Sequence, residues 1–329
     1  MVTINTLPHA ETLDRLRSER YLGEERGMRM AEFPAGDRDL LVRLYAALRE
    51  ALHAAQTGIQ EKNPLRTLEM VRAAGWKPLL LEFMAAFGQI RPESDSPERV
   101  REVYHDIRGG ALSMVNMRVE IAMMKGNEAD MDDAHGIFFA ARDHLKILRN
   151  CVIDIDPPRR QRDMEHHLHS AELLRQKWTD LHAGDLEIEY HSDFDGAISS
   201  CCLEFSSLER VLYNLVNNAA RHSADGKVRF FVREIRDQTE GHDVQFAVAN
   251  RVKPEERAVL EQRFAGDLSG LFRGGFTIGG TGVGMKVIAE IVANAYGLTS
   301  VAAATEGGYV GAQLVGDEFV AWAHWPAME

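Results

Sequence analysis

The sequence predicts two fold classes in series, an all-helical N-terminal half followed by an α+β C-terminal half. From about residue 10 to residue 152, apolar residues recur at spacings of three and four, as on one face of a helix. Pro157 and Pro158 then mark a change, after which Leu186–Tyr190 and Val228–Ile235 read as strands. The chain of 329 residues is long enough for two or three domains, each with its own core.

The first 92 residues are predicted to form a helical N-terminal region. Its apolar spacing indicates four helices, separated by turn residues such as Asn63, over Glu11–Glu24, Asp37–Gly58, Pro64–Ala74 and Pro78–Phe87. We find no internal repeat, low-complexity tract or ligand-binding motif in this region. The sequence therefore gives no prediction of any signal that it receives.

Residues 93–158 are predicted to form an antiparallel helical hairpin. The first helix, running to Lys125, carries a seam with alternating spacings of four and three, made of Val103, Ile107, Gly110, Met114, Met117, Ile121 and Met124. The second begins near Asp132 and has the apolar stripe Ile137, Phe138, Ala141, Leu145, Leu148 and Val152. An exposed stripe of this kind would pair with a second copy, which predicts a dimeric four-helix bundle. The seam places His105 on the opposite, outward face.

Residues 159–329 are predicted to form an α/β sandwich. Three helices are expected, over Met164–His182, Ser207–Ser223 and Gly282–Tyr296. They alternate with six predicted strands, Leu186–Tyr190, Ile198–Leu203, Val228–Ile235, Val244–Asn250, Val301–Ala304 and Phe319–Trp325. Mixed strands with helices on one face make a two-layer α+β domain.

The composition is that of a soluble globular protein, with 45% apolar and 27% charged residues. No run of 18 apolar residues and no apolar N-terminal segment occurs, so we expect no membrane span, no secretory signal and a cytoplasmic location. A net charge of −12 argues against non-specific nucleic-acid binding. The three cysteines, Cys151, Cys201 and Cys202, suit a reducing compartment. The adjacent pair is either a redox or metal feature or, as we favour, two small residues in a β segment.

Two motifs in the C-terminal half indicate a nucleotide site. Asn214 and Asn218 stand four residues apart, so they share one helix face, where their amide oxygens can converge on a hydrated Mg²⁺. Both are poor helix formers in an apolar helix, which favours function over mere packing on the sheet. About sixty residues later follows the glycine box, Gly280, Thr281, Gly282, Val283 and Gly284. Such a run lets the backbone approach phosphates and opens a helix whose free N–H groups favour anions.

A third motif, in the hairpin, offers a nucleophile. His105 is followed by Asp106 and, within one turn, by Arg108. A neutral imidazole is a nucleophile near neutral pH, an adjacent carboxylate can hold the other ring proton, and an arginine can meet phosphoryl charge. The alternative is an ordinary surface histidine, because the chain has 13 of them.

With the histidine motif first, followed by the asparagine motif and then the glycine box, the chain resembles two-component sensor histidine kinases over about residues 95 to 329. The resemblance implies a dimerisation and histidine-phosphotransfer hairpin, a GHKL-type ATP-binding domain and a regulatory role for residues 1–92. It implies that His105 is autophosphorylated from Mg²⁺-ATP and passes the phosphoryl group to an aspartate of a response-regulator receiver domain. It also implies that Asn218 is the Mg²⁺ ligand, that Asn214 and the glycine box line the site, and that Arg221 and His222 contact phosphates.

The sequence departs from the family pattern in three places. The adenine-binding box is normally Asp-x-Gly-x-Gly, whereas here Asn250 stands at the aspartate position and Val252 and Pro254 replace the glycines. A neutral acceptor makes a weaker hydrogen bond than a carboxylate, so we expect ATP affinity to fall about tenfold. The predicted lid over ATP, Phe264–Gly279, is short for the family. Gly109–Gly110 stands where a small polar residue and proline are common, which argues against phosphatase activity.

Rival interpretations remain open. A pseudokinase scaffold of the same fold would dock a response regulator or another kinase without efficient ATP turnover, and an ATPase or serine kinase of the same superfamily is a third reading. His166, His167 and His169 would suit a metal, although a solvated helix face is the favoured interpretation. Met114, Met117, Met123 and Met124 would suit a partner groove, although core packing is favoured.

Overall fold

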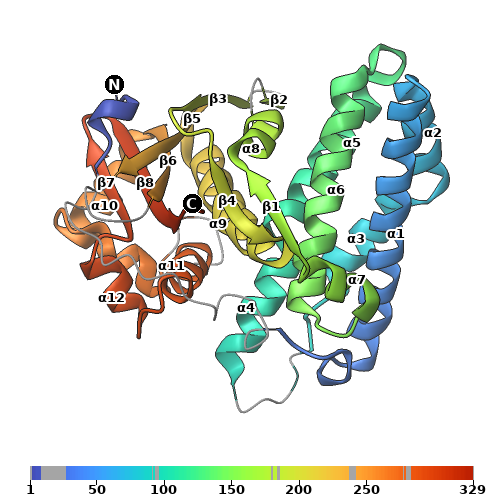
Figure 1. Cartoon of the computed structure of the whole chain (residues 1–329), viewed down its shortest axis with the longest axis horizontal. Coiled ribbons are helices and arrows are strands. Elements are labelled where there is room, and N and C mark those ends of the chain that lie inside the picture. The colour runs from blue at the N-terminus through green and yellow to red at the C-terminus, as the bar shows by residue number, and fades with distance from the viewer. Residues whose placement is uncertain are drawn as a thin grey trace. The chain divides into compact units, whose positions relative to one another are not determined.

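The computed structural model describes residues 2–8, 27–90, 92, 96–178, 181–183, 186–236, 242–276, 278 and 283–328. The chain forms two compact units, shown in Figure 1. Residues 23–164 make up a helical unit, and residues 165–329 form the second unit together with the N-terminal segment. The regions predicted as 1–92 and 93–158 thus share one unit, and the first residues belong with the C-terminal half. The predicted helix Glu11–Glu24 lies outside the described residues.

The helical unit contains seven α-helices among the described residues: α1 (Ala35–Gln60), α2 (Pro64–Ala73), α3 (Trp76–Ala86), α4 (Pro97–Arg108), α5 (Gly110–Lys125), α6 (Met131–Cys151) and α7 (Pro157–Asp163). Local signals set their starts. The Asn63 side chain accepts the Arg66 N–H before α2, and Asp130 caps α6 by accepting the Asp132 and Asp133 N–H groups. The three predicted N-terminal helices that are described are confirmed, and so are a helix end at Lys125 and the start of another helix near Asp132.

The continuous first helix of the hairpin is a wrong prediction, because the helix breaks at Gly109. Gly109 is extended, with φ −101° and ψ −161°, and it separates α4 from α5. Two successive glycines weaken a helix by up to about 1 kcal/mol each, which makes this the weakest point of the segment. After the break, the buried face of α5 differs from the predicted seam. Met124 is 78% exposed, while the buried stripe of α5 is formed by Leu112, Val115, Val119 and Ala122.

The chain covers its own hairpin. Helices α5 and α6 pack together, joined by a short 3₁₀ turn (Gly126–Glu128), while α1 packs along α6 and α2 lies against α5. The covering face of α1 is fully apolar, formed by Leu41, Leu44, Leu48, Ala51 and Ala55, none of them more than 1% exposed. The four packed helices therefore come from one chain, whereas the predicted bundle took two from a second copy. A dimer would need a surface that α1 and α2 leave open.

The second unit is built on a six-stranded sheet in the order β2-β3-β5-β6-β8-β7, in which only the β3–β5 pair is parallel. Its strands are β2 (Leu181–Ala183), β3 (Leu186–Ser192), β5 (Ser223–Arg236), β6 (His242–Val252), β7 (Val310–Val315) and β8 (Glu318–Pro326). A separate pair joins β1 (His166–Ser170) to β4 (Ala197–Cys201). Helices α9 (Cys202–His222) and α11 (Gly284–Ala295) pack on one face of the large sheet. The predicted α/β sandwich is confirmed.

Among its described residues, this unit has three further α-helices, α8 (Ala171–Trp178), α10 (Pro254–Phe264) and α12 (Val301–Glu306). Two elements predicted for this unit are wrong. The predicted helix Met164–His182 is instead β1, α8 and β2, because β1 pairs with β4, a contact that local sequence does not reveal. The predicted strand Val301–Ala304 is helical, because the Ser300 side chain accepts the Ala303 N–H and caps α12.

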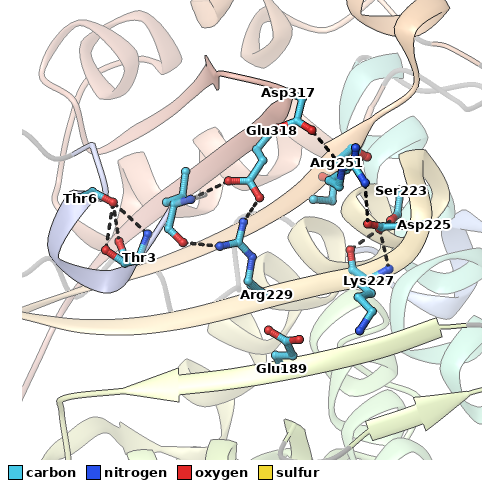
Figure 2. A network of polar contacts seen from close by, with 12 residues as sticks. Thr3, Thr6, Glu189, Ser223, Asp225, Lys227, Arg229, Arg251, Asp317 and Glu318 are labelled. Atoms are coloured by element: carbon cyan, nitrogen blue, oxygen red, sulfur yellow. Dashed lines mark hydrogen bonds and ion pairs between the residues drawn. The ribbon is translucent and has the colours of Figure 1, made fainter.

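The opposite face of the sheet is covered by the chain's N-terminal segment. Val2 and Leu7 are buried there against side chains from β5, β6 and β8: Phe231, Ala247, Ala249 and Val320. Figure 2 shows the polar contacts around this segment, with Arg229 next to Glu318. Both faces of β6 are therefore buried, which explains why its sequence lacks a polar–apolar alternation.

Among the described residues, no helix has the length and apolar character needed to cross a membrane.

Candidate nucleotide site and phosphoacceptor

Helix α9 places the two asparagines in the second unit. The Cys201 side chain accepts the Glu204 N–H at the start of α9, so the favoured reading of the cysteines as small structural residues agrees with the contacts. Three turns later Asn214 is 8% exposed, and its Nδ2 donates to the Arg210 carbonyl at 2.9 Å. Asn218 is half-buried one turn further on. The i, i+4 spacing thus presents both amides on one helix face, as predicted.

Helix α11 begins directly against these amides. A Cβ atom built on Gly284 would lie 3.1 Å from Asn214 Oδ1 and 3.6 Å from Asn218 Nδ2. Asn218 Nδ2 also donates to the Met285 sulfur at 3.3 Å. The structure therefore brings the asparagine motif and the end of the glycine box together. Val283 precedes α11 and is half-buried, whereas Gly280, Thr281 and Gly282 lie outside the described residues.

Asn250 has the properties of a ligand acceptor. Its side chain is buried on β6, and Nδ2 donates to the Arg251 carbonyl at 3.1 Å. In the described part of the chain, its buried Oδ1 has no hydrogen-bond partner. A buried acceptor without a donor is costly, so such atoms usually mark a missing ligand or water. An amino group of a bound ligand would supply the donor that this position lacks.

A divalent cation also fits the site. Asn218 commits its amide nitrogen to Met285, and Oδ1 makes no hydrogen bond with the described residues. An amide oxygen is a ligand type that Mg²⁺ accepts together with waters and substrate phosphates. Among the described residues, no three His, Cys, Asp or Glu side chains gather into a metal group. His166, His167 and His169 in fact lie on β1, not on a helix, and they form no such group either.

Arg221 and His222 end α9 beside the site. Nδ1 of His222 lies 3.1 Å from Glu256 Oε2 of α10, and this contact connects the two helices. Arg221 is exposed. Their contact with phosphates stays a prediction.

The segment predicted as a flexible lid is partly packed. Within it, a 3₁₀ helix (Leu268–Arg273) buries Leu268, Leu271 and Phe272 and lies against α11, α12 and β7. Asp267 caps this turn by accepting the Ser269 N–H. Leu268–Arg273 is therefore packed against the domain and is not a flexible part of the predicted lid.

The candidate phosphoacceptor lies on α4 of the helical unit. Nδ1 of His105 is 3.2 Å from Asp106 Oδ1, and the Asp106 side chain is buried. An imidazole that donates from Nδ1 carries its lone pair on Nε2. The His105 side chain is 14% exposed, so the face predicted to point outward is largely covered.

The side chain of Arg108, a half-buried residue, contacts backbone carbonyls. Its guanidinium donates to the carbonyls of Met84 at 2.8 Å and Phe87 at 3.3 Å, at the C-terminal end of α3. Cationic groups are favoured at helix C-termini, where carbonyls lack partners. Its predicted role toward phosphoryl charge stays a prediction.

A second contact on α4 was not predicted from the sequence. The Tyr104 hydroxyl donates to Asp37 Oδ2 of α1 at 2.5 Å, and Asp37 Oδ1 accepts the Gly88 N–H at 3.1 Å. Burial and the Asp37 carboxylate raise the pKa of Tyr104 well above its usual range. The Tyr104 ring also stacks on Phe87, with centroids 4.7 Å apart. Residues on both sides of His105 are thus fixed to the N-terminal helices.

Comparison with known proteins identifies one domain. The family model described as "Histidine kinase-, DNA gyrase B-, and HSP90-like ATPase" matches residues 204–322. This range contains both asparagines, Asn250 and the glycine box. No curated protein sequence matches the chain.

Similar solved structures are distant. A mycobacterial sensor histidine kinase, MprB, is 18% identical, covers 49% of this chain and 97% of its own, and has a TM-score of 0.28. The Acinetobacter baumannii histidine kinase AdeS is 13% identical over 68% of this chain and 98% of its own, with a TM-score of 0.29. The histidine kinase domain of the Erythrobacter litoralis EL346 blue-light activated histidine kinase is 13% identical over 88% and 94%, with a TM-score of 0.30. At these TM-scores the likeness carries no argument for this chain.

The family match and the contact of Gly284 with Asn214 and Asn218 agree on the same residues. Residues 204–322 therefore form an ATPase domain of the histidine kinase, DNA gyrase B and HSP90 family, which confirms for this domain the resemblance predicted from the sequence.

Proposed function

We propose that the chain is a protein-histidine kinase of a two-component system, which phosphorylates its own His105 from ATP and then transfers the phosphoryl group to a response-regulator aspartate. The observation that carries the proposal is the juxtaposition of Asn214, Asn218 and Gly284 within an ATPase-family domain. The chain that holds this site also presents His105 beside a buried carboxylate. A donor site and an acceptor are thus present in one protein.

Each part of the nucleotide would meet a suitable group. Asn250 Oδ1 would accept from the adenine amino group, and the N-terminus of α11 would favour the phosphates. Asn218 Oδ1 would bind Mg²⁺, which when bound neutralises charge on the phosphates. Because Gly284 has no side chain, α11 can begin directly beside the asparagine amides.

His105 would act through Nε2. With Asp106 accepting a proton from Nδ1, the lone pair of the neutral ring would lie on Nε2. Nε2 would attack the γ-phosphorus, the bond from that phosphorus to the bridging oxygen would break, and ADP would leave with the electron pair. The positive charge that develops on the ring would be stabilised by the buried Asp106 carboxylate. Transfer to a regulator aspartate would reverse the N–P bond formation and restore the neutral imidazole.

The N-terminal helices are in a position to regulate His105. Helix α4 is separated from α5 at Gly109, and its Tyr104 and Arg108 are bound to α1 and α3. A shift of α1 or α3 would therefore be transmitted directly to the segment that bears the nucleophile. We propose that the unidentified signal acts through these contacts.

A pseudokinase scaffold is the second candidate, and two observations favour it. Asn250 replaces the carboxylate of the adenine box, and the Arg108 guanidinium is bound to α3 carbonyls. Such a protein would keep the fold and dock a response regulator or another kinase. Measurable phosphorylation of His105 would exclude it.

Incubation with Mg²⁺ and γ-labelled ATP tests the proposal. We expect an acid-labile label that is lost in His105→Ala and kept in His191→Ala, a matched control at an exposed histidine of β3. No label would support the scaffold, and an acid-stable label would support a serine kinase. The absence of nucleotide binding at millimolar ATP would reject the site itself.

Partners and location complete the proposal. The receiver domain of a response regulator is the expected partner, and capture with phosphorylated protein would identify it. A homodimer would have to use the surface that α1 and α2 leave open, which sedimentation of the purified chain would test. The need for ATP agrees with the cytoplasmic location predicted from composition, and no nucleic-acid partner is expected at a net charge of −12.

A further inference from the structure

The outer face of the ATPase-domain sheet is built to receive an extended segment. The outward positions of β6, Ala247 and Ala249, are small, and together with Phe231 of β5 and Val320 of β8 they form an apolar surface, here called the seat. All four side chains are buried. An antiparallel sheet can leave such a face polar and solvated, so an apolar outer face indicates that it has an occupant.

Residues 2–8, here called the strap, occupy this seat. Val2 is 2% and Leu7 is 3% exposed, whereas Thr3, Asn5 and Thr6 point away and are exposed. Thr3 and Thr6 close a single 3₁₀ turn between the two anchors through a hydrogen bond from the Thr3 N–H to the Thr6 hydroxyl at 2.9 Å. The strap therefore uses a turn to place Val2 and Leu7 on the sheet.

Polar groups on the sheet hold the strap backbone. The Val2 N–H donates to Glu318 Oε2 at 2.6 Å, and the Arg229 guanidinium binds both the Val2 carbonyl and Glu318 (Figure 2). At the other end, the amide nitrogen of the buried Gln245 donates to the Pro8 carbonyl. These hydrogen bonds are made to the backbone at both ends of the strap. They therefore fix the position of the strap along the sheet, in addition to the packing of its two apolar side chains.

The path of the chain between the two units determines what the docked strap connects. The strap is bound to the ATPase unit, the chain enters the helical unit before α1, and it returns to the ATPase unit near residue 165. Only 18 residues, 9–26, separate the strap from Gly27, a span of at most about 65 Å at full extension. The ATPase domain is therefore connected to the helical unit at both ends of that unit.

We propose that the strap is a reversible second tether, through which the N-terminal helices limit the range of positions that the ATPase domain takes relative to the helical unit. Release of the strap would leave one covalent connection near residue 165 and widen that range. The occupant is the chain's own N-terminal segment, bound in cis. The tether rests on the two-unit architecture and needs no phosphotransfer, although it would regulate the approach to His105 under the proposed function.

Leu7→Asp tests the tether in the full-length chain, since it places a carboxylate on the apolar seat. Asn5→Asp is the matched control, because it adds the same charge at an exposed position of the same strap. Glu318→Gln weakens the polar anchor from the sheet side without inserting a charge. Hydrogen exchange should show about tenfold or greater loss of protection in the strap and in the facing strands for Leu7→Asp. Asn5→Asp should match the parent chain, and Glu318→Gln should lie between them.

Spin labels then measure the range of domain positions. Leu81 on α3 and Val259 on α10 are exposed and are replaced by cysteine, with Cys202→Ser because the other two native thiols are buried. We expect Leu7→Asp to shift or widen the distance distribution by more than about 5 Å, beyond the movement under about 1 Å typical of preorganised contacts. Asn5→Asp should leave it unchanged.

Three outcomes would overturn the proposal. Unchanged exchange in Leu7→Asp would show that the strap is not docked. Increased exchange with an unchanged distance distribution would show that it only covers the sheet. Protection that rises with protein concentration would show docking in trans, from a second copy. None of these measurements uses ATP. The tether can therefore be tested even if the chain does not phosphorylate itself.

Discussion

Tyr104→Phe is the substitution that best tests whether the N-terminal helices control the phosphoacceptor. It removes only the hydroxyl that donates to Asp37 at 2.5 Å and leaves the ring stacked on Phe87. Both partners are buried, with Tyr104 8% and Asp37 5% exposed, so water cannot replace the lost donor without rearrangement. A hydrogen bond to a charged group contributes about 1.5–3 kcal/mol, and we expect the opening free energy of α4 to fall by about that amount.

Two measurements in the full chain read this change. Native-state hydrogen exchange gives the opening free energy of the α4 amides directly, which avoids a global unfolding midpoint in a protein of two units. Phosphorylation by phosphoramidate, a small donor that bypasses the ATPase domain, reads the access to His105. Since the His105 side chain is 14% exposed, we expect loosening of α4 to raise that rate by about tenfold, equivalent to about 1.4 kcal/mol.

Tyr45→Phe provides the matched control. The Tyr45 hydroxyl donates to Asp156 at 2.7 Å, and this tyrosine is 7% exposed in the same unit but is not attached to α4. We expect a comparable loss of local stability around α1 and no change in phosphorylation of His105. Equal rates for Tyr104→Phe and the parent chain, despite a measured loss of α4 protection, would refute control through this contact. A coupling energy below about 0.5 kcal/mol in the Tyr104→Phe, Asp37→Asn cycle would refute the hydrogen bond itself.

Three further predictions concern the site and the core. Gly284→Ala should weaken nucleotide binding about tenfold by isothermal titration, because its Cβ would lie 3.1 Å from Asn214 Oδ1, whereas Gly36→Ala, with nothing within 4 Å, should bind normally. Asn250→Asp should tighten ATP binding about tenfold in the same titration, because a carboxylate accepts more strongly than an amide, and weaker binding would contradict the assignment of the adenine contact. Burial lowers the pKa of His144 from 6.5 to about 3, so the unfolded chain binds a proton between these values while the folded chain does not. Stability measured by urea unfolding should therefore fall by about 1.4 kcal/mol per pH unit as pH drops below 6.5, and His144→Asn should reduce that slope.

Local chemistry explains what was predicted correctly. Asn214 and Asn218 share a helix face because of their spacing alone, and Gly284 opens α11 because glycine permits close approach. The first residues of α2 and α6 follow from Asn63 and Asp130, whose side chains cap the N-termini of these helices through contacts only two or three residues away. Signals that act over only a few residues can be recognised in full from a short stretch of sequence.

One wrong prediction arose where a distant contact decided the outcome, whereas the break at Gly109 and the helix α12 have local causes. The segment Met164–His182 has enough apolar spacing for a helix, but β1 within it pairs with β4. The source of the helices that cover the hairpin could not be predicted from the sequence, because an apolar stripe shows only that it will be covered, not by what. Helices α1 and α2 of the same chain cover the hairpin.

The sequence by itself determined the two fold classes, the nucleotide-binding motifs and the helix that bears His105, because periodicity, capping and glycine geometry act over a few residues. Only the tertiary structure decided that Tyr104 binds Asp37, 67 residues away, and that Val2 binds Glu318, 316 residues away. Apolar stripes and single polar groups accept many partners of similar shape and charge. The choice among those partners is made by the packing of the whole chain, where each contact is stabilised by the others.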